Sequence, residues 1–228
     1  MPRQRINKEI LLDQAYDIVK CRGIFALSAK SLSQAASCSV QPIYSYFENM
    51  DELKDYVYQR AGKEYQKFLI ETVALLREKY KGESAALFNG MAHILFADQL
   101  PHLFFLLFQQ TLSTAISTML PHISEGQVCV EWLVQRIGET FEEKERDMAQ
   151  GFFLFIHGTA CAVHSGLVKM DMSLLISFLK HQYLHVRSSV HVRTNPENSL
   201  QQKKNKLESS YSCFRGFSGL SGNIEDTY

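Results

Sequence analysis

Hydrophobic residues recur every three or four positions through most of residues 7–187, which is the spacing of amphipathic helices. Runs of alternating β-branched residues bounded by turn signals, which would indicate strands, are missing. The pattern therefore predicts an all-α protein. The expected helices lie between Asn7 and Gly23 and at 29–36, 40–47, 50–79, 84–98, 101–118, 125–145, 147–168 and 171–187.

Four polar residues stand where helices are expected to begin. Their side chains are predicted to accept hydrogen bonds from the first free backbone N–H groups: Asn7, Ser28, Ser39 and Asn49. Pro42 falls in the first turn of its helix, where no N–H is needed. Gly23 stands where a left-handed residue is expected to end the first helix. The N-terminal 49 residues thus predict three short helices, the last two joined by a tight turn.

This arrangement is what a helix-turn-helix requires, because its second helix must enter the major groove of DNA. One face of the 40–47 helix is expected to anchor it through Ile43 and Phe47. The outer face is small or polar, as groove entry demands. It consists of Val40, Gln41, Pro42 and Ser45, with Tyr44 at its edge.

The run from Ile10 to Val57 resembles the N-terminal domain of the TetR family of bacterial transcription regulators, over roughly residues 8–57. The matching positions are Ala15, Gly23, Ser28, Leu32, Ala36, Tyr44, Phe47 and Asp51-Glu52-Leu53. The chain departs from the family at Ser37, where a turn glycine is common, and at Val40 and Met50, where lysines are frequent. The resemblance implies a helix-turn-helix DNA-binding domain at 1–49 and a helical ligand-binding and dimerisation domain at 50–190.

The expected DNA contacts combine base readout with phosphate contacts. Gln41 suits adenine, Val40 and Pro42 suit thymine methyl groups, and Tyr44 is expected at a phosphate. Each has a plainer alternative: Gln41 as a solvated side chain, Tyr44 as a core-edge aromatic, and the N-terminal arginines as a solubilising terminus rather than minor-groove or phosphate contacts. The full expected set is Arg3, Arg5, Ser28, Lys30, Ser39, Val40, Gln41, Pro42, Tyr44, Ser45 and Lys54.

Residues 87–108 hold five phenylalanines interleaved with polar side chains. Apolar walls with a few polar groups are typical of a small-molecule cavity, so the set favours a hydrophobic or aromatic ligand. Any single phenylalanine is more simply a core residue. The expected ligand-binding residues, including three from later helices, are His93, Phe96, His102, Phe104, Phe105, Phe108, Trp132, Phe152 and Phe155.

The segment 147–168 is apolar almost all round, which predicts burial on every side. Together with 171–187 it would form a four-helix dimer interface of the kind the resembled family has. A homodimer also suits a helix-turn-helix protein, which usually reads two half-sites related by two-fold symmetry.

His157, Cys161 and His164 share one helical face and have metal-binding side chains. Packed, hydrogen-bonded residues are the preferred interpretation, so we expect no metal and no other cofactor. Phosphate-binding loops, nucleophile elbows and metalloprotease motifs are missing, so we expect that the protein is not an enzyme.

Charge and composition add limits. The chain has 24 basic and 24 acidic residues, but residues 1–46 carry six basic and three acidic side chains. An 18-residue apolar run, a signal sequence and a CxxC motif are missing, so we expect a reduced cytoplasmic protein without a membrane segment. Residues 191–228 are polar and are expected to be a disordered tail.

Two functions follow. The first is a ligand-responsive transcriptional regulator, a repressor that binds a palindromic operator as a dimer and is released by a small hydrophobic or aromatic effector. The alternative is a helical dimer of the same ancestry with weakened DNA binding, acting through a protein partner.

Overall fold

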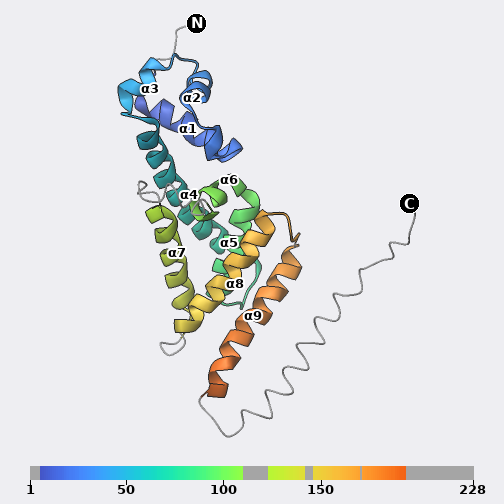
Figure 1. Ribbon diagram of the computed structural model, residues 1–228. Helices are drawn as coiled ribbons and strands as arrows, with labels where there is room; N and C mark the ends of the chain where they lie inside the picture. Colours follow the sequence, from blue (N-terminus) through green and yellow to red (C-terminus); the bar gives the residue numbers. More distant parts are fainter. Residues whose placement is uncertain (1–5, 110–122, 142–145, 170, 194–228) are drawn as a thin grey trace, which may run out of the picture. The chain divides into compact units, whose positions relative to one another are not determined.

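We describe a computed structural model for residues 6–109, 123–141, 146–169 and 171–193. These residues form helices and connecting turns only, which confirms the all-α prediction. They divide into two compact units, one extending to Tyr183 and the other beginning at Leu184. The elements, shown in Figure 1, are α1 (Lys8–Arg22), η1 (Ile24–Ala26), α2 (Ala29–Ala35), α3 (Gln41–Tyr46), α4 (Met50–Lys79), α5 (Ala85–Gln99), α6 (Pro101–Phe104), the π-helical turn η2 (Phe105–Gln109), α7 (Ile123–Gly138), α8 (Arg146–His164) and α9 (Met172–Arg193).

Three of the four predicted caps are confirmed. The Asn7 side chain accepts a hydrogen bond from the N–H of Ile10, and Ser28 forms a capping box with Ser31. Asn49 accepts from the N–H groups of the second and third residues of α4. Each bond satisfies a donor that the helix itself leaves unpaired.

The cap predicted at Ser39 is wrong. Val40 is the N-cap of α3, and no side chain bonds the free N–H groups there. Pro42 does lie in the first turn, as predicted, where it removes one donor that would otherwise need a partner. Gly23 ends α1 with φ 82° and ψ 167°, so φ is positive but ψ is extended rather than left-handed helical.

Several predicted boundaries differ from the structure. The helix expected over 101–118 is α-helical only to Phe104 and then continues as the π-helical turn, while 110–122 lie outside the described residues. The next helix ends at Gly138 rather than 145, and α8 ends at His164. Helix α9 continues to Arg193, into the segment expected to be a tail, and 194–228 lie outside the described residues.

Helix α5 is the centre of the first unit. It packs against α4, α6, α7 and α8, and its residues from Ala86 to Ile94 are all buried. Among the described residues no single helix is long and apolar enough to cross a membrane, but α5 passes that test jointly with the segment 101–109, at a bend of 109°.

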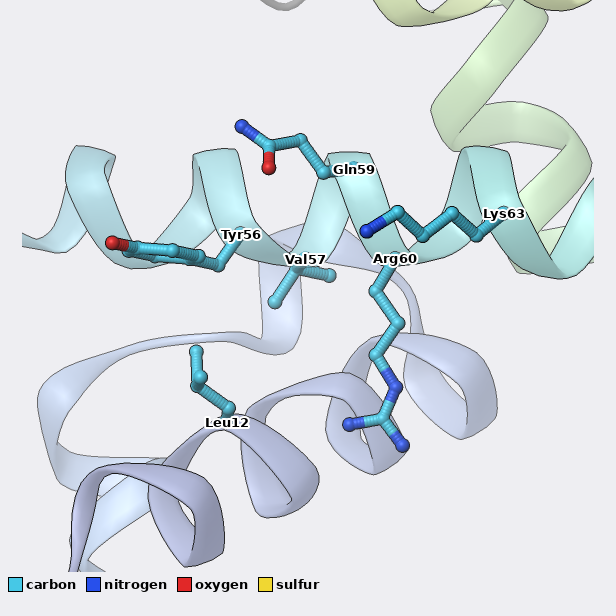
Figure 2. Close-up of a pocket in the computed structure, with 6 residues that line it drawn as sticks. All are labelled: Leu12, Tyr56, Val57, Gln59, Arg60 and Lys63. Atoms are coloured by element: carbon cyan, nitrogen blue, oxygen red, sulfur yellow. The ribbon is translucent and has the colours of Figure 1, made fainter.

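Helix α1 lies along α4, and this contact fixes the N-terminal helices on the rest of the unit. Leu12 of α1 and Val57 of α4 point toward each other across a pocket of about 230 Å³, and Arg60 extends from α4 toward α1 (Figure 2). Arg60 pairs with Asp13 and lies 4.4 Å from the centre of the Tyr16 ring. Two further ion pairs join the same helices, Lys8–Glu52 and Lys20–Glu64.

Candidate functional site

The exposed face of α3 is formed by the residues that the sequence assigned to DNA reading. Ile43 and Phe47 are each 1% exposed and anchor the helix, whereas Tyr44 is 53% and Val40 38% exposed. The remaining predicted residues line one open pocket of about 300 Å³, formed by Ile6, Ser39, Gln41, Pro42, Ser45 and Tyr46. Because this face lacks a covering helix among the described residues, its side chains are free to meet a partner surface.

The turn between α2 and α3 is tight and strained at one residue. Ser37 has φ 51°, in the left-handed region that non-glycine residues rarely adopt. The N–H of Cys38 donates to the carbonyl of Ser33 at 2.9 Å, which holds the reversal closed. Ser37 thus stands at a position where glycine would be the least strained residue. Its backbone conformation reverses the chain and keeps α2 and α3 in a helix-turn-helix arrangement.

The other predicted DNA contacts have mixed surroundings. Lys30 is exposed, and Ser28 is exposed but bonded within its capping box. The Lys54 ammonium lies 2.8 Å from the Asp51 carboxylate, so its charge is partly neutralised within α4. Arg3 and Arg5 lie outside the described residues.

A hydrogen-bonded chain of four side chains crosses the core of the first unit. The Tyr65 hydroxyl of α4 lies 2.8 Å from Nδ1 of His93 on α5. Nε2 of His93 lies 3.1 Å from Nδ1 of His157 on α8. Nε2 of His157 lies 3.6 Å from the Cys161 sulfur, one turn further along α8. Both nitrogens of each imidazole therefore have a partner.

Burial keeps Tyr65 and the two imidazoles uncharged at neutral pH. Burial and the nearby His157 lower the pKa of His93 to about 3, and burial also lowers the pKa of His157. Burial raises the pKa of Tyr65 well above its usual value. Tyr65, His93 and His157 are thus neutral donors and acceptors.

Aromatic rings enclose the chain. The Phe104 and Phe108 rings lie 5.6 and 5.3 Å from the His93 ring, and Phe96 packs edge-on against Tyr65 at 5.0 Å. Trp132 of α7 lies 6.4 Å from Tyr65. The structure thus brings together five of the predicted ligand-binding residues, His93 included.

Four of the predicted residues lie elsewhere. Phe152 packs against Tyr183 and Phe155 against Phe178, so both of these rings contact α9. Phe105 packs against Phe25 and His164. The fourth, His102, has Nδ1 3.4 Å from where a Cβ on Gly23 would stand. Phe105 and His102 therefore link the α6 region to the end of α1 and to η1.

Sequence reasoning missed three members of the cluster. Tyr65 and Phe153 were not singled out, and His157 was noted only as a candidate metal ligand. The Phe153 ring stacks on His157 at 5.6 Å, and Phe153 also lines a groove of about 480 Å³ between α7 and α8. The histidine and cysteine spacing on α8 was the available signal, since it already placed His157 and Cys161 on one face.

The three residues with metal-binding side chains on one face of α8 separate into two parts. His157 and Cys161 bond each other, whereas the His164 ring packs against Phe104 at 5.4 Å. Within the described part of the chain, no group of three or more histidine, cysteine, aspartate or glutamate side chains is arranged to hold a metal ion.

Known proteins resemble this chain in structure only. No protein-family profile and no curated protein sequence matches it. Its fold is similar to that of the multidrug binding protein EbrR, in a crystal structure complexed with imidazole, with a TM-score of 0.56 over 78% of this chain and 95% of EbrR. The two sequences are 11% identical, so the likeness concerns the fold.

Proposed function

We propose that the protein is a ligand-responsive transcriptional regulator that represses by binding a palindromic operator as a homodimer. The observation that carries the proposal is the exposed face of α3, held by a tight turn after α2 and anchored by the buried Ile43 and Phe47. Val40, Gln41 and Tyr44 are exposed on that face, and this exposure supports base and phosphate contacts in a major groove.

The proposal assigns different roles to two neighbouring residues of α3. Gln41 is exposed and pairs with an adenine edge, a contact worth about 1–3 kcal/mol of base discrimination. Tyr44 contacts a phosphate and carries no sequence information.

Binding-site selection from random DNA tests both roles. Wild-type protein is expected to enrich a palindrome, Gln41→Ala to lose preference at one position per half-site, and Tyr44→Phe to bind all sequences more weakly with the preference intact. A selection that enriches no sequence would contradict the proposal and favour a helical dimer acting through a protein partner.

The effector site in this proposal is the aromatic cluster around His93. Helix α4 is continuous from its cap at Asn49 to Tyr65 inside the cluster, so a ligand that moves Tyr65 also moves the start of α4 beside α3. EbrR, which has a similar fold, is a multidrug binding protein, and this supports a small hydrophobic or aromatic effector here. The ligand acts only if it binds one arrangement of α4 better than the other.

The proposed dimer interface is the outer face of residues 147–187. The segment is not buried on every side within one chain, because Leu154 of α8 is 68% and Leu174 of α9 53% exposed. A Cβ added at Gly151 or Gly158 would meet nothing within 4 Å, so a second copy can approach α8 closely. Exposed apolar side chains on one face favour a contact between copies.

Sedimentation of a matched pair of variants tests the dimer. Leu154→Glu is expected to give monomers because it buries a charge in the proposed interface. Leu75→Glu is the control, since Leu75 of α4 is 67% exposed and lies outside the interface. A dimer that survives Leu154→Glu would contradict this interface.

A further inference from the structure

The pocket between α1 and α4 has positively charged side chains on its wall (Figure 2). The described residues that line it are Leu12 of α1 and, on α4, Tyr56, Val57, Gln59, Arg60 and Lys63. Two of these side chains are cations and none is an anion. The pocket has a volume of about 230 Å³. It therefore has the charge and the size to receive a small organic anion.

The helical repeat brings the polar lining residues together on α4. Tyr56, Arg60 and Lys63 are separated by four and three residues, so they are neighbours on the helix surface. Val57 follows Tyr56 in the sequence, is fully buried and points toward Leu12 (Figure 2). The pocket thus combines a polar wall from α4 with an apolar floor to which both helices contribute.

The sequence around Lys63 offers its ammonium no carboxylate. The residues three and four positions away on α4 are Gln59, Arg60, Gln66 and Lys67. Like charges at this spacing repel each other. Lys63 is exposed and forms no ion pair with another described residue, whereas Lys67 pairs with Glu71. An anion in the pocket would supply the charge that Lys63 lacks.

Arg60 also keeps donors for a ligand. One of its terminal nitrogens pairs with the Asp13 carboxylate of α1. A guanidinium has five N–H donors in a planar fork, so this pair leaves others for a second acceptor. The Tyr56 ring is 37% exposed and offers a flat apolar surface in the same pocket.

We propose that this pocket binds a small carboxylate with an aromatic body. The carboxylate accepts hydrogen bonds from the Lys63 ammonium and from the remaining Arg60 N–H groups. The aromatic body packs against Tyr56, Val57 and Leu12, whose apolar surface an inorganic anion would leave uncovered. The ligand contacts α1 and α4 at once, and its binding does not depend on DNA.

The charge of the ligand distinguishes this pocket from the aromatic cluster around His93. Burial keeps His93 neutral, so a carboxylate in that cluster would lose its hydration without gaining a cation. An aromatic carboxylate therefore selects the pocket between α1 and α4. The absence of binding here would leave the regulator proposal, which uses the cluster, unaffected.

The probe is 4-fluorobenzoate added to the full-length protein, with binding followed by fluorine NMR. A dissociation constant on the order of 1 mM is expected for a ligand of this size. 4-Fluorobenzamide has a similar shape without the charge and is expected to bind at least about threefold more weakly. Equal affinities for the acid and the amide, or no binding of the acid up to about 10 mM, would overturn the proposal.

Two lysine variants of α4 locate the carboxylate. Lys63→Gln is expected to weaken 4-fluorobenzoate by about threefold to fivefold, the range of an exposed charge pair, and to leave 4-fluorobenzamide unchanged. Lys67→Gln is the matched control, since Lys67 is also exposed but does not line the pocket, and is expected to change neither affinity. A Lys63→Gln protein that keeps the full affinity for the acid would overturn the site.

A larger side chain on the floor and a competing anion test the aromatic body. Leu12→Phe fills the space between α1 and α4 and is expected to abolish binding, whereas Leu75→Phe, at an exposed position outside the pocket, is expected to have no effect. Inorganic phosphate is expected to displace 4-fluorobenzoate only at concentrations at least about tenfold higher. Displacement by phosphate at equal concentration, or full binding by a folded Leu12→Phe protein, would overturn the assignment to an aromatic carboxylate.

Discussion

We define the head as residues 6–49. Its helices α1 and α2 begin at polar side chains that accept hydrogen bonds from the backbone of their own first turns. Asn49, the last residue of the head, caps α4 in the same way. The body, defined as residues 50–183, is held by contacts between distant segments, such as the chain that joins Tyr65, His93 and His157. The capping hydrogen bonds join residues that are close in the sequence, whereas the core contacts join residues that come together only when the helices pack. The two regions therefore respond differently to substitution and to pH.

The largest expected effect comes from a glycine at a helix contact in the body. A Cβ on Gly126 of α7 would overlap the carbonyl oxygen of Leu107, which is backbone and cannot rotate away. Gly126→Ala should lower the free energy of unfolding by about 3 kcal/mol, the upper range for overpacking. Urea unfolding followed by Trp132 fluorescence measures it.

Gly138→Ala, on the same helix, is the matched control for that substitution. A Cβ there would lie 3.8 Å from the Cβ of Ala149, an ordinary contact distance, so the same change should be neutral or stabilise α7 by up to about 1 kcal/mol. Equal effects at the two glycines would show that the contact between α7 and Leu107 does not hold the body together.

Acidification should destabilise the body through His93. Its pKa is about 3 in the folded chain, below the ordinary value of 6.5, so below pH 6.5 the unfolded chain takes up a proton that the folded chain does not. Folding stability is therefore complete above pH 6.5 and falls by about 1.4 kcal/mol for each pH unit below it, until pH 3. Unfolding curves at pH 7 and pH 5 should differ by about 2 kcal/mol from this residue.

His93→Gln should remove that part of the pH dependence while leaving the dependence from other groups. The head has no histidine in its sequence, so a head variant such as Ser39→Ala should keep the wild-type slope. An unchanged slope in His93→Gln would show that His93 is not kept neutral by burial.

A smaller effect is expected at the last cap of the head. The Asn49 side chain accepts from the N–H groups of Asp51 and Glu52, each at 2.9 Å. Asn49→Ala should cost about 1 kcal/mol. Ser39→Ala is the comparison, since Ser39 caps nothing, and should change stability by less than about 0.5 kcal/mol. A larger loss at Ser39 than at Asn49 would reverse the assignment of the caps.

The smallest expected effect is a gain. Ser37 has φ 51°, where a residue with a Cβ is strained by roughly 1–2 kcal/mol. Glycine relieves this strain, but its greater conformational freedom in the unfolded chain offsets part of the gain. Ser37→Gly should therefore raise the free energy of unfolding by about 0.5 kcal/mol, which a slightly higher melting temperature would show. A loss of stability would indicate that the serine side chain supports the turn.

The contrast between local caps and long-range packing explains which features could be predicted from the sequence. The caps at Asn7, Ser28 and Asn49 were predicted because each is a local pattern of a few residues. The cap predicted at Ser39 is wrong, because α3 begins at Gln41 and its N-cap residue is Val40, whose side chain has no oxygen to accept from the free N–H groups. In the head, most of the fold could be predicted from the order of residues.

In the body, the sequence predicted helices and an aromatic cluster but not all of its members. Phe152, Phe153 and Phe155 are nearly adjacent, and one residue turns a helix face by about 100°. Only Phe153 lies four residues before His157 on the same face of α8 and stacks on it, and its contact with His93 depends on how α8 packs on α5. Tyr65 was missed because its hydrogen-bond partner, His93, is 28 residues away in the sequence.

The most direct test of the regulator is operator affinity measured with and without a bound effector. A palindrome obtained by selection would be titrated with protein by fluorescence anisotropy, in the presence of aromatic compounds that bind the body. A compound that binds among Phe104, Phe108 and His93 is expected to weaken operator binding, typically by ~5–150-fold, and His93→Ala should blunt this while leaving ligand-free DNA affinity unchanged. If every compound that binds the body leaves operator affinity unaltered, the coupling between the aromatic cluster and the head does not exist.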